Sequence, residues 1–188
     1  MSYTNGLDKP TDYFEAKLYT GNESNLNITG LDFAPNLVWI KDRTTDHSNC
    51  WYDSVRGVQK RLQSNNTEAE GTDANGVTAF NSDGFTIGNS SSVNQNNDSF
   101  VSWNWKAGTS VSGTTTGSGT GKAYSGSVNT TSGFSIITYL GNGSAGHTIP
   151  HHLGAVPKFI IVKQSIGGAE NWFNYHVSLG NTKDIHLN

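Results

Sequence analysis

The sequence predicts an all-β protein, in which a β-sandwich or jelly-roll unit is followed by a partial second copy of the same unit. The first observation is composition: the 188 residues include 5 Trp, 7 Tyr and 8 Phe but only one Met, and Gly, Ser, Thr and Asn form nearly half of the chain. Aromatic residues favour strands, whereas Gly, Asn and Ser favour turns. The other observations are short apolar runs and an internal repeat.

The apolar runs mark the expected strands. Residues 13–19 and 134–140 alternate imperfectly between apolar and polar side chains, as half-buried strands do. Residues 37–40 and 159–162 are continuous apolar runs, which are typical of central strands covered on both faces.

A further strand is expected where Val101, Trp103 and Trp105 alternate with polar residues. Side chains on a strand point alternately to its two faces, so both indoles lie on one face. We expect that face to point into the core, because large aromatic side chains dominate protein cores.

Several motifs recur in the same order with nearly constant spacing. The first copy contains YTGN, PNLVWIK and YDSVRG, at residues 19–22, 35–41 and 52–57. The second contains YLGN, PKFIIVK and YHVSLG, at residues 139–142, 157–163 and 175–180. Leu62 and Ile185 continue the correspondence. An ordered series of this kind indicates a structural repeat.

The repeat predicts the domain organisation. Residues 1–108 form the first sandwich unit, and residues 134–188 form part of a second unit, which we expect to continue beyond residue 188. Residues 109–133 are almost entirely small and polar, so they are expected to form a flexible Gly/Ser/Thr-rich linker. The alternative is a long surface loop within one domain.

Charge and cysteine content argue against several classes of protein. The formal net charge is −3, so no basic excess is present for binding a nucleic-acid backbone. No apolar segment approaches the length of a membrane span, so we expect no membrane insertion. A single cysteine, Cys50, excludes an intramolecular disulfide and argues against a thiolate metal site.

No motif predicts catalysis, and no cofactor is expected. The acidic residues are scattered singly rather than paired as in glycosidases, and no nucleophile-elbow motif is present. His147, His151 and His152 lie close together in the sequence, but without an acidic or cysteine partner they indicate a polar loop rather than a metal site. The acidic segment 68–75 could hold calcium, although a solvated loop is the simpler interpretation.

Four aromatic residues are candidates for ligand binding because they fall at or near equivalent points of the two copies. These are Trp51, Tyr52, Trp172 and Tyr175. Sugar-binding sandwiches often present aromatic faces of this kind. The alternative is that these side chains belong to the core.

The opening MSYTNGLDKPTDYFEAKLYTGN and the motifs ITGLDFAPNLVWIKDR, YDSVRG, FNSDGFTIG and SWNWKAG resemble a family of tail-fibre-like structural proteins. These proteins belong to tailed phages that infect marine bacteria, and they have concanavalin-like sandwich domains. The resemblance implies a non-enzymatic virion protein that is assembled in the bacterial host cytoplasm. It carries over no catalytic residue.

The resemblance favours a tail or head fibre whose N-terminal part docks to the particle and supports attachment to the host surface. Expected partners are other virion proteins, further copies of the chain (such as a trimer) and host-surface glycans. A capsid decoration (cement) protein is the alternative, and a carbohydrate-binding, lectin-like module is the third.

Overall fold

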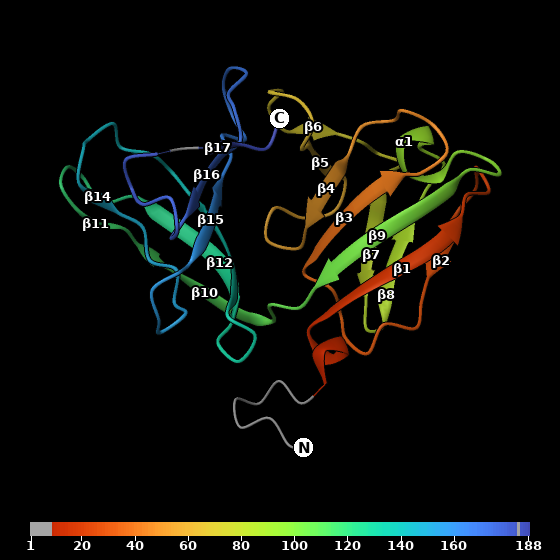
Figure 1. Cartoon of the computed structure of the whole chain (residues 1–188), viewed down its shortest axis with the longest axis horizontal. Coiled ribbons are helices and arrows are strands. Elements are labelled where there is room, and N and C mark those ends of the chain that lie inside the picture. Colours follow the sequence, from red (N-terminus) through yellow and green to blue (C-terminus); the bar gives the residue numbers. More distant parts are fainter. Residues whose placement is uncertain (1–8, 184) are drawn as a thin grey trace.

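The computed structural model describes residues 9–183 and 185–188. The strand pairings among these residues are antiparallel, which confirms the all-β fold class. Figure 1 shows the first part of the chain (residues 9–108) beside a second part (residues 109–183 and 185–188). The elements of the first part are η1 (Pro10–Asp12), β1 (Phe14–Thr20), β2 (Leu26–Ile28), β3 (Leu37–Asp42), β4 (Cys50–Asp53), β5 (Lys60–Gln63), β6 (Gly71–Thr72), β7 (Val77–Asn81), β8 (Gly84–Ile87), α1 (Ser91–Asn94) and β9 (Ser99–Trp105).

The first part is a β-sandwich. One sheet has the strand order β1-β9-β3-β4-β5-β6, and the other has the order β2-β8-β7. Buried side chains from both sheets and from α1 form one cluster between them; it consists of Ile28, Val38, Ile40, Cys50, Tyr52, Val77, Phe85, Ile87, Val93 and Phe100. Burial of this apolar area stabilises the sandwich.

The two tryptophans of β9 face away from this core, so the expectation that they face inward is wrong. Ser102 and Asn104 are fully buried, and they share their face of the strand with the core residue Phe100. Trp103 and Trp105 therefore lie on the opposite face. Alternation along β9 places the tryptophans and Phe100 on opposite faces. The face that carries Phe100 is the one that packs against the second sheet.

The second part begins with strands rather than with a flexible linker. β10 (Thr109–Thr114), β12 (Ala123–Asn129) and β13 (Phe134–Tyr139) form a three-stranded sheet in that order. The short β11 (Thr116–Gly117) pairs with β14 (His147–Thr148). The expectation of a structureless linker over residues 109–133 is thus corrected.

Small polar residues suffice here because a strand ladder needs only the backbone N–H and C=O groups. The Ser125 and Thr138 hydroxyl oxygens also lie 2.9 Å apart across β12 and β13, as cross-strand hydroxyl pairs do. Gly126 is required by close packing, because a Cβ atom there would collide with the carbonyl oxygen of Ile136.

The remaining strands form a separate three-stranded sheet. β15 (Phe159–Val162), β16 (Phe173–His176) and β17 (Ile185–His186) pair in that order. The apolar run 159–162 was expected to be a central strand, yet β15 is an edge strand with exposed side chains. The corresponding run in the first part does lie centrally, since β3 is flanked by β9 and β4.

The two parts pair corresponding strands in the same register. Val38 lies opposite Tyr52 in the β3–β4 pair, and Ile160 lies opposite Tyr175 in the β15–β16 pair. The next strand agrees as well, because Trp51 faces Leu62 and Asn174 faces Ile185. These are the positions that the sequence repeat aligns. The division into one full and one partial unit remains a prediction.

Candidate functional site

A row of tryptophans lies on the outer face of the large sheet. The Trp39 and Trp103 ring centroids are 5.6 Å apart, and those of Trp39 and Trp51 are 5.4 Å apart. β9, β3 and β4 place these rings side by side because Trp39 lies directly opposite both of its neighbours in the register. The row continues into the second part of the chain, since Trp172 lies 5.3 Å from Trp51.

Trp172 connects the two parts of the chain. Its side chain is only 2% exposed. The indole N–H is shared between the carbonyl oxygens of Gln63 and Asn66, at 3.0 and 3.1 Å. A buried Trp usually needs a partner for its N–H, and here the first part of the chain supplies it.

Backbone hydrogen bonds support this contact. The N–H of Glu70 donates to the carbonyl of Ser165, and the N–H of Glu170 donates to the carbonyl of Thr67, both at 2.9 Å. Lys163 adds a charged donor, because its Nζ donates to the same Thr67 carbonyl at 3.0 Å. Loop 64–70 and segment 163–172 are thus fixed together by polar groups around a buried indole; we call this contact the Trp172 joint.

The structure does not gather the four predicted ligand-binding aromatics into one site. It brings Trp51 and Trp172 together, but in ring contact with each other, and Trp172 is buried. Tyr52 lies in the sandwich core, and its hydroxyl donates to Asp73 at 3.0 Å. Tyr175 is half-buried in β16. Trp172 and Tyr52 therefore cannot offer an open face to a sugar, and the alternative of core aromatics describes both.

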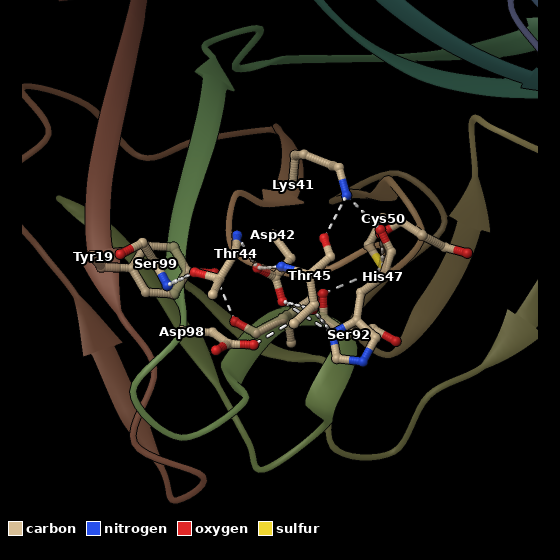
Figure 2. Close-up of polar contacts among 12 residues, drawn as sticks. Tyr19, Lys41, Asp42, Thr44, Thr45, His47, Cys50, Ser92, Asp98 and Ser99 are labelled. Atoms are coloured by element: carbon tan, nitrogen blue, oxygen red, sulfur yellow. Dashed lines mark hydrogen bonds and ion pairs between the residues drawn. The ribbon is translucent and has the colours of Figure 1, made fainter.

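A polar cluster at the end of β3 was missed in the sequence. Among the residues that the structure describes, Asp42, His47 and Asp98 are the one group whose ligand atoms converge, lying within 4.8 Å of one another. Figure 2 shows the cluster at the loop that follows β3. Its only sequence signal is the run DRTTDH, which looks like an ordinary turn.

The oxygens of Asp42 are already used by this loop. Oδ1 accepts the N–H groups of Thr44 (2.8 Å) and Thr45 (3.1 Å), and Oδ2 accepts the Thr45 hydroxyl (2.7 Å) and lies 3.0 Å from His47 Nδ1. Burial opposes ionisation of Asp42, but the hydrogen bonds from Thr45, Thr44 and His47 outweigh it and lower the carboxyl pKa. The cluster could offer ligands to a cation, but the hydrogen bonds of Asp42 are those of a side chain that stabilises a turn.

In the acidic segment 68–75, the carboxylates of Glu70 and Asp73 contact protein groups. Glu70 accepts from Arg56 at 3.0 Å and lies 3.7 Å from Lys60 Nζ. Asp73 accepts the hydroxyl of Ser90 at 2.8 Å, in addition to the Tyr52 hydroxyl. These contacts connect the segment to neighbouring elements, as expected for a structural loop.

The three histidines predicted to lie in a polar loop do not converge, and His147 lies in the short strand β14 rather than in a loop. His147 Nδ1 lies 2.8 Å from Asn142 Nδ2, and His152 Nε2 lies 2.9 Å from the Tyr124 hydroxyl. His151 Nδ1 accepts the N–H of Leu153. Each imidazole has a different protein partner.

Cys50 lies in the core and is fully buried, as expected for a small apolar side chain. Burial raises the pKa of its thiol to about 12. The reactive thiolate is therefore scarce at neutral pH.

A family described as a domain of unknown function, DUF7483, matches residues 9–188. No curated protein and no solved structure matches the chain. No helix in the described part of the chain is long and apolar enough to cross a membrane.

Proposed function

The chain belongs to the DUF7483 family, and we propose that it is a non-enzymatic structural protein of a phage virion. In this proposal it forms part of a tail or head fibre. Its N-terminal part docks to the particle and supports attachment to the host surface. It would assemble with other virion proteins and with further copies of itself.

The Trp172 joint is the observation that carries the proposal. A fibre must transmit force and keep its domains in line, which a flexible tether between them would not do. Here a buried indole and paired backbone hydrogen bonds join the two parts. Local opening of this joint must expose the indole and leave its N–H unpaired, so the joint resists bending.

The motifs that carry the phage resemblance occupy positions that specify the fold. SWNWKAG supplies the β9 tryptophans, and YDSVRG supplies the turn at Asp53 and Arg56. In that turn Asp53 Oδ1 accepts the N–H of Arg56 at 2.9 Å, and the Arg56 side chain returns to Asp53 Oδ2 at 2.6 Å. The resemblance thus concerns architecture, which supports a structural rather than a catalytic role.

In this proposal a phage encodes the chain, so purified virions of that phage provide the test. We expect the protein in the particle proteome at a fixed copy number, and we expect gold-labelled antibodies against residues 9–188 to decorate fibres. Decoration over the capsid shell would favour the cement-protein alternative instead. Absence of the protein from particles that contain the known capsid and tail proteins would contradict the virion role.

A further inference from the structure

The second part of the chain exposes the face that the first part buries. We propose that the β15–β16 face and the free edge of β15 are a docking surface for a polypeptide segment outside residues 1–188. This segment would have the pattern of residues 77–105, namely a strand hairpin followed by an alternating strand. The inference comes from the two sheets themselves and does not depend on the virion role.

Corresponding side chains differ sharply in burial. Val38 and Ile40 of β3 are 0% exposed, whereas Ile160 and Val162, which occupy the same register positions in β15, are 40% and 39% exposed. The next strand repeats the contrast, because Phe173 is 41% exposed where Cys50 is fully buried. Exposed apolar side chains that gather on one face in this way mark an interaction site.

The first part shows what covers such a face. Val77 of β7, with Phe85 and Ile87 of β8, packs against Val38 and Ile40 in the core cluster. These covering strands belong to the 77–105 segment. No corresponding hairpin lies over β15 and β16 among the described residues, where the sheet consists of β15, β16 and β17.

The unpaired edge of β15 supports the same inference as the exposed face. In the first part β9 pairs with the edge of β3 that is not occupied by β4, and Val38 lies opposite Asn104. In the second part β15 pairs with β16 alone among the strands of residues 9–183 and 185–188. Its outer edge therefore presents backbone N–H and C=O groups to an added strand, which is the arrangement that strand-addition partners use.

A second copy of this chain does not fit the requirement. Its own β9 is held between β1 and β3, with seven register pairs on one side and six on the other. It could be donated only by dismantling the donor's large sheet. The occupant is therefore a segment that is not already paired in a sheet. Its hairpin carries apolar residues, and apolar and polar residues alternate along its following strand.

A synthetic peptide with the sequence of residues 77–108 is the probe, added to the intact chain. Hydrogen exchange would follow the backbone amides of Phe159, Ile160, Ile161 and Val162. Alternate amides of an edge strand point toward its free edge, and we expect the peptide to slow the exchange of those amides by about tenfold or more, because strand pairing protects amides. A peptide of the same composition in shuffled order should have no effect.

Two variants of the chain make the test specific. Ile160→Lys places a charge on the proposed surface at an already exposed site, so folding should survive while the peptide effect disappears. Val156→Lys, at an exposed residue outside β15 and β16, should leave the effect intact. Exchange that is unaffected by the peptide would overturn the proposal. Protection that grows with protein concentration in the absence of peptide would also overturn it, since a second copy would then be the occupant.

Discussion

The indole N–H of Trp172 donates to the carbonyl oxygen of Gln63, a residue 109 positions earlier in the chain. The same ring lies against Trp51 of the first part. One side chain thus joins two sheets that share no strand pairing in the part of the chain that the structure describes. This contact is the basis of the first prediction.

Replacing Trp172 by Ala should destabilise the protein strongly. Loss of a large buried aromatic ring costs about 3–5 kcal/mol, because both the transfer free energy and the packing are lost. Denaturant unfolding would measure the change. Trp172→Phe keeps a ring but lacks the N–H, so it should cost less and separate the two contributions. If Trp172→Ala unfolded at the same denaturant concentration as the parent, the joint would not contribute to stability.

Arg56 should be equally sensitive, because it is a largely buried cation. Its Nε donates to Asp53 at 2.6 Å and its Nη1 donates to Glu70 at 3.0 Å. Arg56→Ala leaves both carboxylates without that partner, and breaking a buried pair costs about 3–5 kcal/mol. Lys9→Ala is the matched control, since Lys9 pairs with Asp32 at the exposed surface and its loss should leave the unfolding midpoint unchanged.

The Asp42 turn predicts a stability loss in acid. The folded-state pKa of this carboxyl lies below its ordinary value, so the folded state binds fewer protons than the unfolded state. The contribution is complete above the unfolded pKa and is lost as the pH falls through the folded pKa. Thermal melts between about pH 5 and pH 2 should therefore show a smaller acid effect in Asp42→Asn.

Asp46→Asn is the control for that series, because Asp46 is exposed in the same loop. It should retain the parent's acid dependence. Parallel curves for the parent and Asp42→Asn would contradict the assignment of this acid sensitivity to Asp42.

Cys50 should not react with thiol reagents while the protein is folded. Its raised pKa keeps the thiol protonated at pH 8, and the core covers the sulfur. A chromogenic disulfide reagent should label it stoichiometrically in denaturant and scarcely without it. Rapid labelling of the folded protein would show that the core opens.

Sequence patterns could predict the strands, because period-two alternation and bounding turns are local. They could not predict which face of a strand is buried. The alternating spacing of Trp103 and Trp105 correctly placed both indoles on one face of β9, but the second sheet packs against the other face, which carries Phe100. Composition also misled over residues 109–133, since strand pairing requires backbone groups and tolerates small side chains.

The sites were harder to predict than the strands. Trp172 was a candidate for sugar stacking, and nothing near it in sequence reveals that residues 63–66 supply its hydrogen-bond acceptors. The Asp42 turn depends on Thr44, Thr45 and His47 folding back onto one carboxylate, which only the tertiary structure shows. Contacts between distant segments leave no periodic trace in the sequence.

The Trp172 joint should hold the two parts of the chain in one arrangement, and a distance distribution between spin labels would measure this rigidity. Asp46→Cys and Asn181→Cys place labels on exposed residues in the first and second parts, while the native Cys50 is protected by burial. Double electron–electron resonance should give one narrow distance peak, which broadens when Trp172→Ala is added. A broad distribution in the protein with Trp172 intact would show that the joint does not hold the two parts rigidly.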